Sequence, residues 1–289
     1  MPIIDTHCHY NLEPLYSGQA FCFKIKDEDS ILKKNWQDHW QEAQKQGITK
    51  SIVVGPGIKS SQKAIEIAEA DDNLFAGIGI HPERANKIDH IEEALEQLTQ
   101  LAKHKKVVAI GETGLDCFYL DTKDINNIKQ TKEKQEKLFI GQIKLANQLN
   151  LPLILHVRDK TEETYLKTLE IIEQYWKFNN SLIFHCVSGP LNYIQKALKM
   201  KNSYFGFDGN LTFKKADDIR GIFSLVQKTD SKKILLETDA PYLAPEPYRG
   251  QVCEPYMIKS TAFYVENKLN ADLEEIYQNS LNAFNINKL

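Results

Sequence analysis

Five of the eight histidines in this 289-residue chain stand at the ends of short apolar segments, and two acidic residues occupy the same kind of position. These residues are His7, His9, His81, His156, His185, Glu112 and Asp239. Imidazole nitrogens and carboxylate oxygens hold divalent ions such as Zn²⁺ and Mn²⁺, and pairs of such ions activate water for hydrolysis. The other three histidines, His39, His90 and His104, lie in polar segments, and we predict that they are surface residues.

His7 and His9 have the spacing of a two-ligand site. On an extended strand, residues separated by one intervening residue point to the same face, so both imidazoles would face one ion. If the last strand lies beside the first, Asp239 joins them. The same alternation turns Cys8 and Cys186 away from the site, so we predict that both are small core residues. The alternative is a structural role, in which the two imidazoles cap the core and form hydrogen bonds with the backbone.

His156 and His185 end two consecutive strand candidates. Neighbouring strands lie about 4.8 Å apart, so these imidazoles are predicted to reach a second ion. Glu112, at the end of the preceding strand candidate, is placed to bridge the two ions. The competing interpretation pairs Glu112 with Arg158, but six candidate ligands at the ends of five strands favour a metal centre.

Eight apolar runs alternate with segments of helical periodicity. The strand candidates are residues 3–6, 51–54, 75–80, 107–111, 152–156, 182–185, 203–207 and 233–238. Continuous apolar runs are typical of parallel strands covered on both faces. The eight repeats predict an α/β fold, a single (β/α)₈ TIM barrel over residues 1–289 with the metal site at the C-terminal ends of its strands. A doubly wound sheet is the competing fold.

An insertion at about residues 10–35 interrupts this pattern after the first strand. It is much longer than the usual connection of about 2–6 residues. Leu15, Tyr16, Phe21 and Phe23 make it too apolar for a disordered linker. It is therefore either a packed surface excursion or a lid that faces the substrate.

Composition limits the partners and the compartment. The 36 Lys and Arg residues against 39 Asp and Glu give a net charge of −3, which excludes a protein that holds nucleic acid over a broad basic surface. The five cysteines form no CxxC pair, and no secretory signal or bilayer-length apolar run is evident. We therefore predict a soluble, cytoplasmic protein.

Six motifs occur in order between residue 4 and about residue 255. They are residues 4–9 (IDTHCH), 79–82 (GIHP), 109–116 (AIGETGLD), 155–159 (LHVRD), 185–189 (HCVSG) and 237–245 (ETDAPYLAP), with 247–250 (PYRG) beyond. With these motifs the chain resembles the TatD family of metal-dependent deoxyribonucleases, which are amidohydrolase-type TIM-barrel hydrolases. The likeness covers nearly the whole chain.

The resemblance implies deoxyribonuclease activity, often exonucleolytic on single strands, with two or three divalent ions. It assigns one ion to His7, His9, Glu112 and Asp239, the other to Glu112, His156 and His185, and a substrate contact to His81. The sequence departs from the family in the long insertion, in Val187 where an aromatic residue is common, and in Cys253 where Asn is usual.

The candidate reaction is hydrolysis of DNA phosphodiester bonds by a metal-activated water. Asp239 is predicted to accept the proton of this water, because Glu112 is held as a bridge. His81 would hold a phosphate oxygen or protonate the leaving group.

Three of the few arginines follow strand-end motifs, and arginine makes bidentate contacts with phosphate. We predict Arg249 and Arg84 as substrate clamps. Arg158 is either a third clamp or a structural partner of Asp159 or Glu112.

Two other functions use the same residues. The metal site could hydrolyse an ester or amide bond, as in a D-aminoacyl-tRNA, a lactone or a dipeptide, or the chain could be a non-enzymatic metal-binding barrel. The ligand types admit Zn²⁺, Mn²⁺ or Mg²⁺. The expected partner is a nucleic-acid substrate, single-stranded DNA or strand ends, with no membrane and no obligate protein partner.

Overall fold

The computed structural model describes residues 1–19, 33–120 and 125–288. Eight parallel strands form one sheet in chain order. They are β1 (Ile3–Cys8), β2 (Ile48–Gly55), β3 (Leu74–Ile78), β4 (Val107–Asp116), β5 (Leu153–Arg158), β6 (Leu182–Phe184), β7 (Ser203–Phe207) and β8 (Ile234–Leu236). Each strand overlaps one of the eight predicted apolar runs.

The last strand segment lies beside the first and nearly closes the sheet into a barrel. Asp239 N donates to His7 O at 2.9 Å, and His9 N donates to Ala240 O at 2.8 Å. A doubly wound sheet reverses its strand order at the centre, whereas the observed order runs without reversal from β1 to β8. The predicted (β/α)₈ barrel is therefore confirmed.

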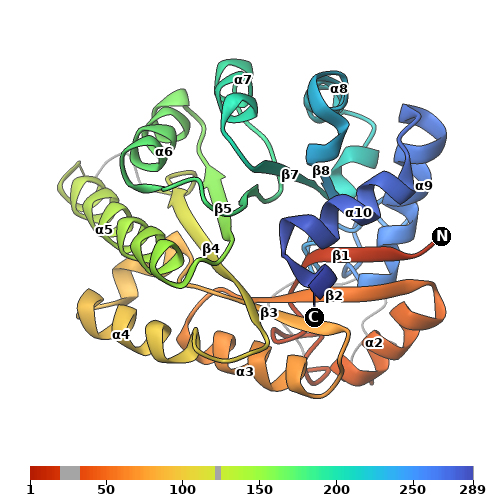
Figure 1. Ribbon diagram of the computed structural model, residues 1–289, viewed down its shortest axis with the longest axis horizontal. Coiled ribbons are helices and arrows are strands. Elements are labelled where there is room, and N and C mark those ends of the chain that lie inside the picture. Colours follow the sequence, from red (N-terminus) through yellow and green to blue (C-terminus); the bar gives the residue numbers. More distant parts are fainter. Residues whose placement is uncertain (20–32, 121–124, 289) are drawn as a thin grey trace.

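Helices alternate with the strands and surround the barrel (Figure 1). They are α2 (Trp36–Lys45), α3 (Ile58–Glu69), α4 (Ile91–Leu101), α5 (Ile125–Leu149), α6 (Glu162–Tyr175), α7 (Leu191–Lys199), α8 (Asp217–Asp230), α9 (Ile258–Leu269) and α10 (Leu273–Ala283). Five 3₁₀ helices accompany them in the described residues: η1 (Pro82–Lys87), η2 (Gly209–Thr212), η3 (Ser231–Lys233), η4 (Pro255–Met257) and η5 (Ile286–Lys288).

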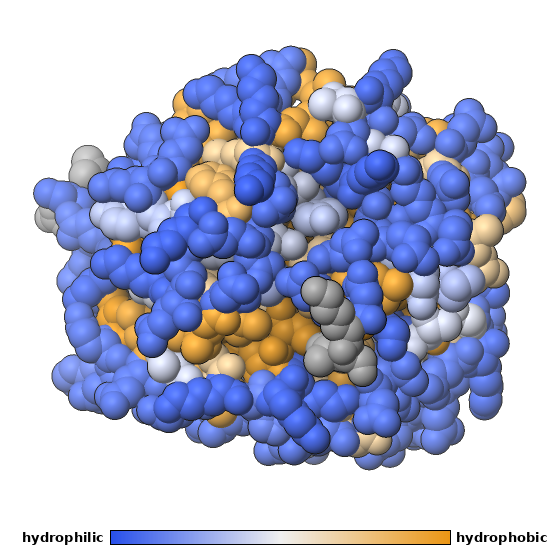
Figure 2. Space-filling view, viewed as in Figure 1, coloured by the Kyte–Doolittle hydropathy of each residue, from blue (hydrophilic) through white to orange (hydrophobic). Residues whose placement is uncertain are grey.

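The helices are amphipathic, with their apolar stripes against the strands. In α7, for example, Tyr193, Ile194, Ala197 and Leu198 recur with helical spacing and are buried. The opposite faces are polar, so hydrophilic residues dominate the surface in Figure 2. Within the described ranges, no helix is both long enough and apolar enough to cross a membrane.

Apolar side chains seal the amino end of the barrel. Ile4 and Ile154 belong to a cluster inside the barrel that packs against Phe284 and Ile286. These two residues follow α10, which contacts β8 and β1 and crosses the strands in Figure 1. The buried residues of this cluster are apolar, and Tyr204, Tyr277 and Leu281 pack against them.

The segment after β1 is described at its two ends. Tyr10 and Leu15 are fully buried, so its first part packs on the barrel as the excursion interpretation expects. Leu12, between them, reaches a cavity at the carboxyl ends of the strands. Phe21 and Phe23, which entered the prediction of a lid, lie outside the described residues.

His39 is not the surface residue that its polar neighbours predicted. It lies on α2 with 1% of its surface exposed, and its Nδ1 is 2.9 Å from Glu254 Oε2. Lys34 Nζ lies 2.7 Å from the same oxygen. The partner is 215 residues away in the chain, so the local polarity of α2 could not reveal the burial.

Candidate metal centre

A cavity of about 800 Å³ opens at the carboxyl ends of the strands. Its lining includes His9, His81, Glu112, Asp116, His156, His185 and Asp239. Parallel strands bring their carboxyl ends to one end of a barrel, which is why residues so far apart in the chain meet here. Five of the six predicted ligands line the cavity, and the sixth, His7, lies buried directly beneath it.

The ends of β1 and β8 form the first group of ligand atoms. Asp239 lies beyond β8 with a φ of +54°, a left-handed conformation, and its Oδ1 is 3.2 Å from His9 Nε2 and 3.8 Å from His7 Nε2. One ligand atom from each residue lies within 4.8 Å of the others. The remaining nitrogen of His9 is 2.8 Å from Val54 O, which holds Nε2 toward the site.

Glu112, on β4, lies at the middle of the cluster. Its Oε2 is 3.7 Å from His7 Nε2. Its Oε1 is 3.7 Å from His185 Nε2 and 3.5 Å from His81 Nε2. Because the two oxygens face different imidazoles, Glu112 has the arrangement that a bridging carboxylate needs.

His156 lies between two carboxylates. Its Nδ1 is 2.7 Å from Glu112 Oε1, and its Nε2 is 2.9 Å from Asp116 Oδ2. Burial alone would lower the pKa of His156, but these hydrogen bonds and charges outweigh it and raise the pKa to about 9. Asp116 was missed by the sequence reasoning, although its even spacing from Glu112 along one strand places it near the same ligands.

His156 and His185 have different neighbours in the structure. Their ring centroids are 6.4 Å apart, whereas His185 stacks on His7 at 3.5 Å. The ring of His156 instead lies 4.2 Å from that of His81. The ligand atoms therefore fall into three groups, one at His7, His9 and Asp239, one at His7, Glu112 and His185, and one at His81, Asp116 and His156.

The buried nitrogens of His7 indicate that the centre fits a divalent ion. Within the described part of the chain, neither ring nitrogen has a hydrogen-bond partner. A buried polar atom left in this way costs about 1–3 kcal/mol. Burial, reinforced by the charge on His185, lowers the pKa of His7 well below its usual value. A neutral imidazole with a free lone pair beside two carboxylates is the state in which histidine binds a metal.

Two further buried carboxylates support the centre. Glu237 Oε1 lies 2.8 Å from His185 Nδ1, an arrangement that orients a metal-binding imidazole. Asp5 accepts a hydrogen bond from Thr238 N at 3.0 Å, and burial raises its pKa to about 8. Sequence reasoning missed Glu237, although it precedes Asp239 by two residues.

Cys186 departs from the prediction that it points into the core. The strand β6 ends at Phe184 and Cys186 has a φ of +43°, so strand alternation no longer applies there. Cys186 lines the cavity, with its thiol 3.7 Å from Asn210 Nδ2. Cys8, in contrast, is fully buried as predicted, with its sulfur 3.1 Å from Ser51 Oγ.

The structure brings two of the three predicted arginines to the cavity. Arg84 and Arg158 line it, and the guanidinium of Arg158 lies 4.2 Å from the centre of the Phe118 ring. Arg249 is not among the described residues that line the cavity. Its guanidinium lies 4.2 Å from the ring of Phe213.

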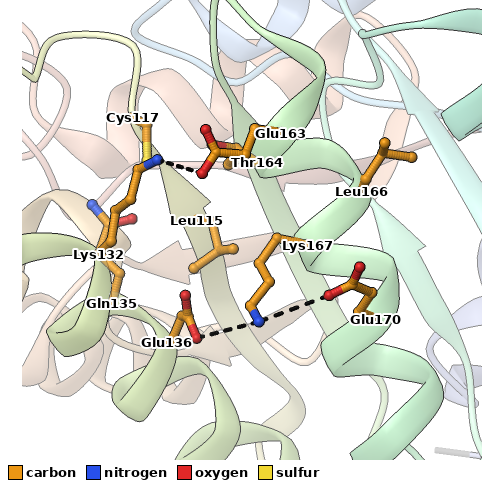
Figure 3. Close-up of a pocket in the computed structure, with 10 residues that line it drawn as sticks. All are labelled: Leu115, Cys117, Lys132, Gln135, Glu136, Glu163, Thr164, Leu166, Lys167 and Glu170. Atoms are coloured by element: carbon orange, nitrogen blue, oxygen red, sulfur yellow. Dashed lines mark hydrogen bonds and ion pairs between the residues drawn. The ribbon is translucent and has the colours of Figure 1, made fainter. Parts of the chain in front are cut away.

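A second cavity of about 440 Å³ lies between α5 and α6 (Figure 3). Both of its lysines face carboxylates. Lys132 Nζ is 2.8 Å from Glu163 Oε1, and Lys167 Nζ is 3.8 Å from Glu136 Oε2 and 3.7 Å from Glu170 Oε2. Its charges are therefore paired within the cavity, and none of the predicted metal ligands is among its described lining residues.

Comparison with known proteins assigns a family to this barrel. The TatD related DNase family matches residues 4–286. The uncharacterized metal-dependent hydrolase YabD of Bacillus subtilis is 32% identical over 289 residues, which cover 99% of this chain and 100% of the relative. The uncharacterized metal-dependent hydrolase YcfH of Escherichia coli is 28% identical over 98% of this chain and 94% of its own length.

A solved structure agrees with these relatives. The crystal structure of YjjV, a TatD homologue from Escherichia coli, superposes with a TM-score of 0.77 at 26% identity, covering 98% of each chain. The family match spans nearly all of the chain, including the strands that carry the histidine and carboxylate cluster. The chain belongs to the TatD family of metal-dependent hydrolases.

Proposed function

We propose that this hydrolase cleaves phosphodiester bonds of DNA, acting on single strands or strand ends. The observation that carries the proposal is the buried cluster of histidines and carboxylates at the base of a cavity that also bears Arg84 and Arg158. A metal centre beside guanidinium groups suits an anionic phosphodiester better than a neutral ester or amide. The family's description as TatD related DNase supports the same substrate.

We assign two divalent ions, Zn²⁺, Mn²⁺ or Mg²⁺, to the ligands predicted from the sequence. The first would be held by His7, His9, Glu112 and Asp239, and the second by Glu112, His156 and His185. The group of His81, Asp116 and His156 would hold a third ion only in place of the phosphate contact that we assign to His81 below. When bound, such ions polarise a phosphoryl oxygen and lower the pKa of the attacking water.

Asp239 is the residue that we assign to accept the proton of the attacking water. Its side chain is 15% exposed and faces the cavity, whereas that of Glu112 is 6% exposed and enclosed by imidazoles. A base must reach the proton that it removes, so exposure favours Asp239. Glu112 is left to hold the cluster together.

His81 is suited to donate a hydrogen bond to a phosphate oxygen. Its Nδ1 accepts a hydrogen bond from Glu83 N at 3.2 Å, which leaves the proton on Nε2, the nitrogen that faces Glu112. Burial, reinforced by the charge of His156, lowers the pKa of His81 to about 3. A neutral imidazole at pH 7 donates through Nε2–H but is a poor source of a proton for the leaving group. Of the two roles predicted for His81, we therefore assign phosphate binding.

Arg84 and Arg158 line the cavity, and we assign them as the substrate clamps. Arg249 stays a prediction from the sequence.

To test the proposed function, end-labelled single-stranded and double-stranded oligonucleotides are incubated with protein loaded with Zn²⁺, Mn²⁺ or Mg²⁺, beside a panel of esters, lactones and amides. We expect release of nucleotides, fastest from single strands. Turnover of the ester and amide panel with intact oligonucleotides would contradict the proposal.

A further inference from the structure

Four basic side chains surround a groove next to the metal centre. The groove has a volume of about 430 Å³ and lies between α3 and η1. Lys59 and Lys63 of α3 and Arg84 and Lys87 of η1 line it. Every charged residue among its described lining residues is basic, in a chain whose net charge is −3.

These four cations are not neutralised by neighbouring side chains. Within residues 1–19, 33–120 and 125–288, Lys59, Lys63, Arg84 and Lys87 form no ion pair, whereas both lysines of the cavity in Figure 3 face carboxylates. Like charges gathered around one groove repel each other unless an anion lies between them. The groove therefore has the charge that attracts an anionic ligand.

The groove is continuous with the cavity of the metal centre. Leu12, Arg84 and Lys87 line both spaces. The helix η1 that carries the two cations begins directly after His81, which lies 3.5 Å from Glu112. A polyanion with one phosphate at the metal centre can therefore continue into the groove.

Two neighbours fix the positions of the cations. A Cβ on Gly57 would lie 2.9 Å from Arg84 Cδ and 3.0 Å from Arg84 Nε, so the missing side chain is what lets the arginine cross the start of α3. Gly57 itself has an extended backbone that any residue adopts. Lys63 Nζ lies 3.7 Å from the centre of the Tyr16 ring, which holds the lysine at the wall of the groove.

We propose that this groove binds the backbone phosphates of a nucleic-acid strand next to the bond that is cleaved. The inference rests on the proposed function, because the substrate class is taken from it. It predicts that strands long enough to fill the groove bind more tightly than a dinucleotide. The groove would meet the phosphate backbone and not the bases, so binding there does not depend on base sequence.

The test uses the full-length, metal-loaded protein and the double variant Lys59→Gln, Lys63→Gln. Glutamine keeps much of the aliphatic stem and removes the charge. The matched control is Lys196→Gln, Lys199→Gln on α7, which changes the net charge equally outside the groove. The readouts are KM for a ten-nucleotide single strand relative to a dinucleotide, and the salt dependence of binding of a phosphorothioate ten-nucleotide strand.

For the groove variant we expect the ratio of the two KM values to rise roughly tenfold. The slope of log affinity against log salt should fall by about 1.4, because each phosphate that a lysine neutralises on a single strand adds about 0.7 to it. Gly57→Ala should change KM in the same direction by displacing Arg84. The control pair should match the wild type in both readouts.

The outcomes separate this inference from the proposed function. If the wild type cleaves DNA and the groove variant behaves like the control pair, the inference that the groove binds phosphates is wrong and the proposed nuclease function stands. The wild type could instead hydrolyse neither oligonucleotide but bind the phosphorothioate strand with a salt slope that depends on Lys59 and Lys63. The nuclease function would then be wrong, and the inference that the groove binds phosphates would stand.

Discussion

The two ends of the barrel are buried alike but have opposite chemistry. At the carboxyl end, His7 is fully buried, its two ring nitrogens have no hydrogen-bond partner among the described residues, and Glu112 lies among imidazoles. At the amino end, Ile4, Ile154 and Phe284 pack in a cluster of apolar side chains. Burying polar groups destabilises the folded state unless they are paired, whereas burying apolar surface area stabilises it.

This contrast indicates that function and stability are separated along the barrel axis. The carboxyl end holds a cluster that is poorly satisfied without a ligand, and the amino end supplies apolar burial that can offset the cost. Substitutions at the carboxyl end should therefore change activity more than stability, and those at the amino end the reverse.

The largest effect is expected for Asp239→Asn at the carboxyl end. Asparagine keeps the shape but cannot accept the proton of the attacking water, so kcat should fall roughly a thousandfold. The midpoint of thermal unfolding should stay close to that of the wild type. Initial rates on single-stranded DNA and thermal denaturation measure the two quantities. Asp218→Asn, at an exposed position of α8, is the matched control. Near-normal hydrolysis by the Asp239 variant would show that Asp239 is not the base.

Phe284→Ala is the corresponding change at the amino end. Phe284 is 2% exposed within the apolar cluster, so the cavity left behind should cost about 3–5 kcal/mol of unfolding free energy. Denaturant titration measures this loss, and Phe284→Leu should lower the free energy of unfolding by less. The kcat of the molecules that remain folded should not change. A loss of kcat in the folded protein would show that the two ends are coupled.

Glu237→Gln should weaken metal binding without a comparable loss of stability. The carboxylate of Glu237 lies 2.8 Å from His185 Nδ1, and loss of such a partner usually lowers metal affinity by about 10–100-fold. Calorimetric titration of the metal-free protein with Zn²⁺ or Mn²⁺ measures the affinity. An unchanged affinity with a lowered unfolding midpoint would make Glu237 a structural residue only.

Asp5→Asn should change the pH dependence of stability and leave kcat near that of the wild type. Burial raises the pKa of Asp5 from 3.8 to about 8, so the folded protein keeps a proton that the unfolded chain releases. The stabilisation is complete below the unfolded value and is lost as pH rises toward the folded value, by up to about 1.4 kcal/mol per pH unit. Denaturant unfolding at pH 5, 6, 7 and 8 should show a shallower decline for the variant. Parallel declines in the two proteins would contradict the assignment to Asp5.

Local sequence was sufficient for the strands and for the residues that end them. Apolar runs marked all eight strands, because strands covered on both faces leave little room for polar residues. Histidines and acids at the ends of those runs indicated where chemistry would gather. His7 and His9 needed only strand alternation to be placed on one face.

Side-chain placements that depend on contacts distant in sequence were missed or misjudged. His39 looked like a surface residue because its partner Glu254 lies in another part of the chain. Cys186 was expected in the core because alternation was extended past the end of β6, where the backbone turns. Arg249 follows a motif of the site and stays a predicted clamp, and its guanidinium lies against the ring of Phe213.

The sequence by itself determined the barrel, its strand order and the residue types at its carboxyl end. Only the tertiary structure decided that Glu112 would face imidazoles from several strands and that both ring nitrogens of His7 would be buried without hydrogen-bond partners in the described part of the chain. It also decided that four cations would surround one groove. Hydrophobic periodicity acts over a few neighbouring residues, whereas the distances within the site depend on how distant strands and helices pack, which local patterns do not encode.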